Sequence, residues 1–393
     1  MSFDWTKKRP APEPPQNPTD DTFPDQDLTE NNENFAAREL VTQEKFTLLQ
    51  SRLQHEYDFA SVPPPRPMLL NYINPFELDL LKEKATSQPF LPQAKVGLFI
   101  APGGTGKTQA LSQLAVSVAT GRAWLDCFHI ANIPGLSASK GRVLLALGEE
   151  DENEIIRRIN PYVKFCLNNL PPTAKTQFEA NLRANLKPLA LDGAGPRMLG
   201  TKPHYEAEPF FDALCKLLEH DQEPWRLIIL DHASRFMGPD CEVDNNAATR
   251  FIELVEQLTK LPGSPTVLLA HHTRKSSSRN DDGKDAARGS SALSDGARWV
   301  AQLKRELQNQ GTPKAPKWKA TGRILLDLDK SNYTRLLNEP IKLKFNDDGY
   351  LERVTENNHQ IIATFDTSQS FTQTQKPSDN KLKHQPPLEQ RNI

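Results

Sequence analysis

Short runs of apolar residues recur between residues 68 and 355 and predict buried β-strands. Each run is four or five residues long and follows a polar residue. Continuous apolar runs of this length are typical of strands that are covered on both faces of a sheet. The predicted strands are Val96–Ile100, Val143–Leu147, Leu227–Leu230, Val267–Ala270 and Ile324–Leu328.

Between the early strands the apolar residues recur every three or four positions, which predicts amphipathic helices. Strands that alternate with helices indicate an α/β protein with a mostly parallel central sheet and helices on both faces. The last strands are separated only by loops, so we expect them to pair as antiparallel hairpins. The predicted helices are Gln109–Ala119, Glu152–Phe165, Glu208–Glu219 and Ala247–Leu261.

The pattern stops at both ends of the chain. Residues 1–38 and 356–393 are rich in polar residues and bury too little apolar surface to offset chain entropy, so both are predicted to be disordered. Residues 39–67 are predicted to hold a helix and a proline-rich linker, and residues 68–355 the folded domain. The helix has an apolar face that packs either on its own domain or on a neighbouring subunit. That face is formed by Phe46, Leu49, Leu53 and Tyr57.

Composition narrows the class of protein. The formal net charge of -2 over 393 residues argues against a uniformly basic nucleic-acid coat protein. The four cysteines form no CxxC pair, which argues against zinc and redox motifs. No apolar run approaches the ~18 residues that a membrane span needs. We therefore expect a soluble, cytoplasmic protein without a membrane partner.

The string APGGTGKT, which follows the strand Val96–Ile100 and precedes a helix, predicts a phosphate-binding loop (P-loop). Backbone N–H groups of the glycine turn and the helix N-terminus favour an anion there. Lys107 would neutralise phosphate charge, and the Thr108 hydroxyl would hold Mg²⁺. Ala101 replaces the usual first glycine, which the loop tolerates unless that position is left-handed. The predicted ATP-binding residues are Ala101, Pro102, Gly103, Gly104, Thr105, Gly106, Lys107, Thr108 and Gln109.

Three further strand ends carry candidate chemistry. The strand Leu227–Leu230 ends in Asp231, which is predicted to place Mg²⁺, although an Asp there could also cap the next helix. The strand Val143–Leu147 leads into Glu149, Glu150 and Asp151, one of which could polarise the attacking water while the others cap a helix. His271 and His272 end the strand Val267–Ala270, where polar groups can touch the γ-phosphate. Neighbouring side chains of a strand point to opposite faces, which argues against a metal site on this histidine pair.

Together these motifs resemble the RecA/DnaB-like P-loop ATPases of the plasmid RepA group, which are ring-forming replicative helicases. The strings that carry the resemblance are APGGTGKT, GEEDENEIIRR, LIILDHASRF, LLAHHTRK and ARGSSALSDGARW, and it spans roughly residues 62–355. It implies a RecA-like core, ATP and Mg²⁺ as ligands, a homo-oligomer that is most often a hexamer, and single-stranded DNA as partner. A replication initiator or a primase is a further partner that it implies.

The resemblance also assigns roles to residues. Lys107 and Asp231 match nucleotide and metal ligands, Glu150 the catalytic glutamate and His272 the γ-phosphate sensor. Residues 329–333 match the strand that carries a trans-acting positive charge. No basic residue stands at 325, where that charge is expected, so Arg323 and Lys330 are the nearest candidates.

The segment that follows the sensor is basic. Residues 271–319 hold eleven Lys and Arg against five Asp and Glu, a local charge of +6. Its position after the predicted sensor favours DNA contact over a merely solvated basic surface. Trp299 lies in the same segment and is predicted to be a core residue. The predicted DNA-binding residues are Arg274, Lys275, Arg279, Lys284 and Arg288.

The sequence therefore predicts an ATP-dependent hexameric helicase or translocase of RepA type that acts in replication of plasmid or other mobile DNA. The alternatives are a RecA-like ATPase that DNA stimulates without unwinding, in a recombination or regulatory role, a small-molecule kinase, and an ATP-gated binding module without turnover.

Overall fold

The computed structural model of the chain describes residues 27–56, 59, 61–74, 87–131, 140–221, 223–272, 291–312 and 315–354, with the backbone alone for residues 27–37 and 291. It divides into two compact units, Met1–Pro65 and Arg66–Ile393. None of the helices in this described part is long and apolar enough to cross a membrane.

The first unit contains one helix, α1 (Asp27–Leu53). It begins at Asp27 rather than after residue 38, so the prediction of a disordered segment up to residue 38 is wrong for residues 27–38. That boundary rested on apolar periodicity, whereas a helix also propagates through good helix formers such as Ala36, Ala37 and Glu39. The predicted apolar face is exposed at Phe46, Leu49 and Leu53; Tyr57 lies outside the described residues.

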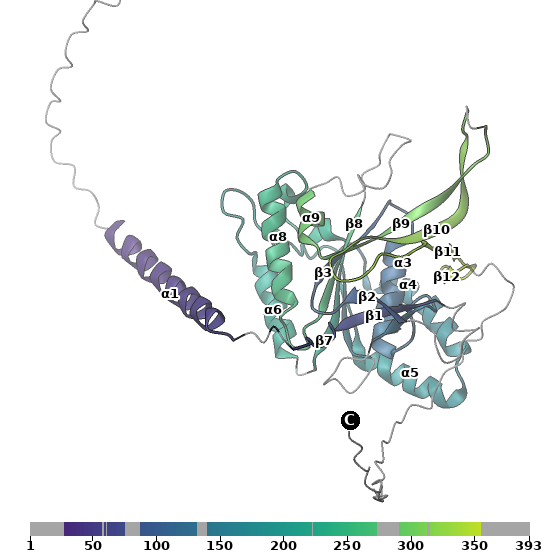
Figure 1. Ribbon diagram of the computed structural model, residues 1–393, viewed down its shortest axis with the longest axis horizontal. Coiled ribbons are helices and arrows are strands. Elements are labelled where there is room, and N and C mark those ends of the chain that lie inside the picture. Colours follow the sequence, from purple (N-terminus) through teal and green to yellow (C-terminus); the bar gives the residue numbers. More distant parts are fainter. Residues whose placement is uncertain are drawn as a thin grey trace, which may run out of the picture. The chain divides into compact units, whose positions relative to one another are not determined.

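The second unit is built on a nine-stranded sheet with the order β12-β11-β10-β9-β3-β8-β7-β5-β6 (Figure 1). All neighbours from β9 to β6 are parallel, and β9 to β12 are antiparallel. The predicted α/β class with a mostly parallel sheet and late antiparallel hairpins is therefore confirmed. Its strands are β3 (Val96–Ala101), β5 (Arg142–Leu147), β6 (Leu186–Ala190), β7 (Trp225–Asp231), β8 (Thr266–His272), β9 (Trp299–Asn309), β10 (Trp318–Ser331), β11 (Ile341–Phe345) and β12 (Leu351–Arg353).

Helices cover both faces of this sheet. One face packs on α3 (Lys107–Thr120), α4 (Glu152–Asn168) and α5 (Pro172–Asn185). The other face packs on α6 (Pro209–His220), α7 (Ala233–Phe236), α8 (Asn245–Leu258) and α9 (Ser291–Gly296). The four predicted helices are all present, with ends that lie within three residues of the predicted ones. A 3-10 turn, Pro239–Glu242, precedes α8.

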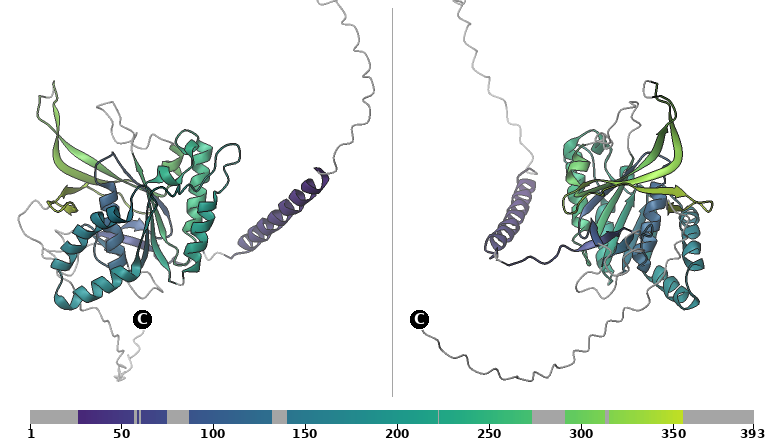
Figure 2. Two further views of the ribbon diagram at one scale, coloured as in Figure 1. Left: turned by 180° about the vertical axis from the view of Figure 1, so that it is seen from behind. Right: turned by 45° about the vertical axis from the view of Figure 1, so that its right-hand side comes forward.

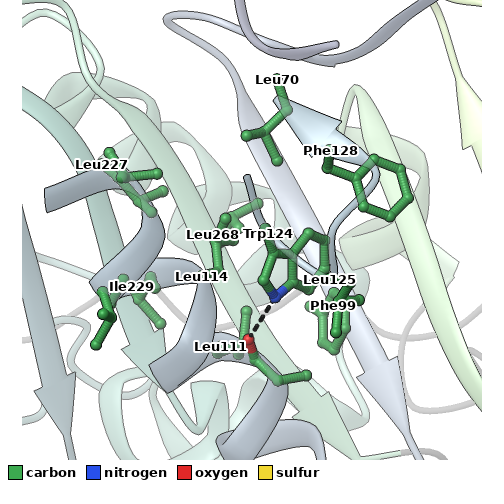
Figure 3. Packing of buried hydrophobic residues seen from close by; sticks show 14 of the residues in the cluster. Leu70, Phe99, Leu111, Leu114, Trp124, Leu125, Phe128, Leu227, Ile229 and Leu268 are labelled. Carbon is green, nitrogen blue, oxygen red and sulfur yellow. Dashed lines mark hydrogen bonds between the residues drawn. The ribbon is translucent and has the colours of Figure 1, made fainter. Parts of the chain in front are cut away.

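A small three-stranded sheet, β2-β1-β4, packs into the α3 side of the core. Its strands are β1 (Met68–Ile73), β2 (Ser87–Pro92) and β4 (Phe128–Ile130). Trp124 lies between this sheet and α3, and its indole nitrogen donates to the Ala110 carbonyl over 3.0 Å (Figure 3). Trp299 is 1% exposed and donates to the Phe90 carbonyl, so its predicted core position is confirmed. These indoles hold α3, the helix that starts at the P-loop, against the sheet.

Candidate active site

The P-loop connects β3 to α3 as the sequence predicts. Ala101 is the last residue of β3 and pairs with His272 of β8, so its backbone is extended and needs no glycine. Gly106 has a φ of 92° at the N-cap of α3. A Cβ atom on Gly106 would stand 2.7 Å from the Phe345 ring, so both the backbone and the space require glycine there.

Lys107 and Asp231 form a buried ion pair at the centre of the site. The Lys107 ammonium lies 2.7 Å from Asp231 Oδ1, and both side chains are 4% exposed. The sheet order brings them together, because β7 ends at Asp231 one strand away from β3. The second carboxylate oxygen, Oδ2, is buried without a hydrogen-bond partner. A buried carboxylate oxygen beside the half-buried Thr108 fits a hydrated Mg²⁺, which carboxylates and hydroxyls hold well. This geometry favours metal placement by Asp231 over helix capping.

The three acids after β5 have three different surroundings. Asp151 caps α4, because its carboxylate accepts from the Glu154 N–H over 2.7 Å. Glu150 pairs with Arg158 of α4 at 2.5 Å. Glu149 pairs with Arg235 of α7 and lies 3.5 Å from His232 Nδ1. The candidates for the base therefore narrow to the two glutamates, and each is held by an arginine.

The two histidines that end β8 point to opposite sides, as neighbours in a strand must. His272 lines the nucleotide hollow and lies edge-on to His232, with ring centroids 5.1 Å apart. His271 is 7% exposed, and its Nδ1 has no partner. Burial and the nearby Lys107 lower the pKa of His271 to about 4. His271 is therefore neutral at pH 7.

This buried histidine predicts a pH-dependent stability. Below pH 6.5 the unfolded chain binds a proton at His271 that the folded chain refuses until about pH 4. The stabilisation is therefore complete above pH 6.5 and is lost as the pH falls towards 4. We expect the free energy of unfolding to fall by up to about 2 kcal/mol between pH 7 and pH 5, and His271→Gln to reduce that fall. Urea unfolding at both pH values measures it, with His272→Gln as the more exposed control; an unchanged fall in the His271 variant would contradict the assignment.

These groups surround one hollow of about 420 Å³ at the carboxyl edge of the sheet. The structure thus brings together most of the predicted catalytic and ATP-binding residues. Its lining includes Pro102, Gly104, Gly106, Lys107, Thr108, Gln109, Glu149, Glu150, Asp231 and His272.

The same hollow contains two residues that the sequence did not single out. Arg158 lines it and pairs with Glu150, and its carbonyl accepts from the Gln109 side chain over 3.1 Å. Phe345, the end of β11, packs on Gly106 and is 42% exposed. β12 is fixed beside it by two hydrogen bonds between the Gln113 side chain and the Leu351 backbone. Arg158 lies inside a string that carries the resemblance, but nothing in the sequence pointed to Phe345.

The remaining predicted residues lie elsewhere. Arg323 is exposed on β10. Lys330 donates to the carbonyls of Ser294 and Asp295 at the end of α9, over 2.7 and 3.1 Å. Neither lines the nucleotide hollow of its own chain. The five predicted DNA-binding residues, Arg274, Lys275, Arg279, Lys284 and Arg288, lie outside the described residues.

A P-loop at the end of a parallel strand, with a buried lysine–aspartate pair and two candidate bases, defines a P-loop nucleotide-binding site. The AAA domain family matches residues 82–278, which is 197 of the 393 residues. The chain belongs to this family and is an ATP-hydrolysing P-loop enzyme.

Two solved structures share similarity with the chain. The ATPase domain of a DnaB-like helicase is 11% identical, with a TM-score of 0.43, over 67% of this chain and 86% of its own. A KaiC-like protein from Pyrococcus horikoshii is 13% identical, with a TM-score of 0.40, over 75% of this chain and all of its own.

Proposed function

We propose that the protein is an ATP-dependent DNA helicase or translocase of RepA type. It works as a homo-oligomer, most often a hexamer, on single-stranded DNA during replication of plasmid or other mobile DNA. The observation that carries the proposal is the convergence of Lys107, Asp231, the two glutamates and His272 on one hollow, from the ends of four neighbouring strands. A site of this kind supplies both hydrolysis and a strand end, β8, that responds to it.

The ATP phosphates bind to the N–H groups of the loop and to Lys107, and the base activates a water beside the γ-phosphate. Thr108 and Asp231 would hold Mg²⁺, which neutralises charge on the phosphates when bound. We assign the base to Glu150. Its carboxylate is 19% exposed against 45% for Glu149, so it is the better shielded from bulk water. Arg158 must release Glu150 before that carboxylate can take a proton.

His272 is the element that joins hydrolysis to DNA. It lines the nucleotide hollow, and residue 273, the start of the basic segment, follows it directly. When the γ-phosphate leaves, the contacts of His272 change, and the segment attached to it moves the bound strand. Only a contact that differs between the two nucleotide states can drive such a movement.

In a ring, a neighbouring subunit supplies positive charge to the bound nucleotide. Arg323 and Lys330, the candidates from the sequence, are joined by a stronger one, Arg298. Arg298 lies with Lys95 and Lys260 around a hollow of about 260 Å³ at the start of β3, the end of the strand opposite the P-loop. A head-to-tail ring brings unlike surfaces of adjacent copies together, so this cluster can face the neighbour's nucleotide.

The proposal is tested by ATP hydrolysis with and without single-stranded DNA, together with sizing of the oligomer and a strand-separation assay. We expect DNA to stimulate hydrolysis, a ring-sized assembly and unwinding of a forked duplex. Stimulation without unwinding would favour the alternative, a RecA-like ATPase in a recombination or regulatory role. Hydrolysis that DNA does not affect would overturn both.

Neutralising Arg274, Lys275 and Arg279 together, by substitution with glutamine, is expected to weaken single-strand binding. Each phosphate contact adds about 0.7 to the slope of log affinity against log salt, so the loss of three lowers that slope by about 2. Titration of a labelled oligonucleotide at several salt concentrations measures it. An unchanged slope would show that this segment does not bind the strand.

A further inference from the structure

The hairpin formed by β9 and β10 projects beyond the helices that cover the sheet (Figures 1 and 2). β9 pairs with β3 only through Trp299–Gln302, and the rest of β9 pairs with β10 alone. Because β9 runs parallel to β3, the hairpin leaves the sheet at the edge that carries the P-loop and His272. The hairpin is therefore beside the proposed motor site.

One face of this hairpin exposes two large apolar side chains. Opposite residues of an antiparallel pair share a face, as do residues two apart in a strand. Leu307 stands opposite Ala320, and Trp318 stands opposite Asn309, so Leu307 and Trp318 are on the same face. Each is 54% exposed. Trp124, Trp225 and Trp299, by contrast, are buried.

Positive charge without a counter-charge surrounds this indole. Lys317, Lys319 and Arg323 are exposed, and no ion pair within the described part of the chain involves any of them. The neighbouring Lys304, in contrast, pairs with Asp327 and Asp329. The one acid of the outer hairpin, Glu306, accepts a hydrogen bond from Thr321 over 2.7 Å. The outer hairpin thus presents an aromatic ring between cations.

This combination favours a nucleic-acid strand over a protein partner. Single strands bind through phosphates on Lys and Arg and through bases stacked on aromatic rings. The cores of protein interfaces are depleted in lysine, and two lysines flank this tryptophan in the chain. The basic segment that follows His272 also starts at this edge of the sheet. A strand drawn along that segment would meet the hairpin.

We propose that the β9–β10 hairpin binds single-stranded nucleic acid, with a base stacked on Trp318 and phosphates on Lys317, Lys319 and Arg323. This inference rests on the proposed function and adds a second contact to it. Arg305 extends the site to the nucleotide: it lies on the Leu307 face and donates to the Gly103 carbonyl of the P-loop over 3.2 Å. The hairpin therefore connects the bound strand to the P-loop.

The test is anisotropy titration of the full chain with a labelled oligothymidylate. We expect Trp318→Ala to weaken binding about tenfold to a hundredfold, which is the usual range for loss of one stacked base. Trp318→Phe should restore most of the affinity, because it keeps an aromatic face. Glutamine at Lys317, Lys319 and Arg323 should lower the salt slope by about 2. Leu217→Ala, at a 59% exposed leucine of α6, is the control and should bind normally.

Leu307→Ala and sizing of each variant separate nucleic acid from a second copy of the chain. If Trp318→Ala and Leu307→Ala both dissociate the oligomer while DNA affinity is kept, the hairpin is a subunit contact and the inference is wrong. If the wild type binds the strand and Trp318→Ala binds equally well, this inference alone fails. If the wild type does not bind it, the proposed function fails too.

Discussion

Lys107→Ala is expected to lower ATP turnover at least about a hundredfold, the usual loss when one preorganised donor to developing charge is removed. The ammonium is the buried positive group of the P-loop, and it already lies 2.7 Å from the Asp231 carboxylate. Without it, the phosphates would face a buried negative carboxylate with no compensating charge. Phosphate release and binding of a fluorescent ATP analogue measure the two effects separately.

The same substitution also destabilises the fold, so a control is needed. Removing one partner of a buried ion pair costs about 3–5 kcal/mol, because the other charge stays buried. The double variant Lys107→Ala, Asp231→Asn removes both charges and should regain much of that stability without regaining turnover. A folded double variant that stays inactive assigns the loss to chemistry. Normal turnover in Lys107→Ala would show that the P-loop assignment is wrong.

Glu150→Gln is expected to keep ATP binding and to lose hydrolysis by about 10²–10⁴-fold, the usual contribution of a general base. The amide preserves the shape of the side chain but cannot take the proton of the attacking water. Glu149→Gln is the informative comparison, because Glu149 lines the same hollow. Its ion pair with Arg235 is about half exposed and contributes little to stability. We expect this variant to hydrolyse ATP.

Glu154→Gln supplies the matched control for Glu150. The Glu154 carboxylate also lies near Arg158, at 3.5 Å, but it does not line the nucleotide hollow. This variant alters the surroundings of Arg158 without touching the proposed base, so its hydrolysis should stay close to that of the wild type. If Glu149→Gln loses hydrolysis and Glu150→Gln retains it, the base is the preceding residue.

Several elements escaped prediction for reasons that lie in their environment. β6 contains a lysine and a proline and lies at the sheet edge, where burial is partial, so its apolar pattern is weak. The outer half of β9 reads Lys-Arg-Glu-Leu-Gln-Asn, because it pairs only with β10 and has no core to face. Sequence patterns report burial, and these strands have little of it.

The sequence by itself determined the features that a few consecutive residues encode. An apolar strand, a glycine turn and a helix start within residues 96–120, so the P-loop follows from local backbone requirements. The runs that end in Asp231, Glu150 and His272 were likewise readable, because buried strands are continuously apolar.

The tertiary structure alone decided which of these ends meet and what holds them. Lys107 and Asp231 are 124 residues apart, and Gln113 and Leu351 are 238 apart. Such contacts depend on strand order and on which helix packs where, and these are set by the packing of the whole core rather than by any short stretch. The pairing of Glu150 with Arg158, the ring of Phe345 on Gly106 and the exposed Trp318 follow from that packing.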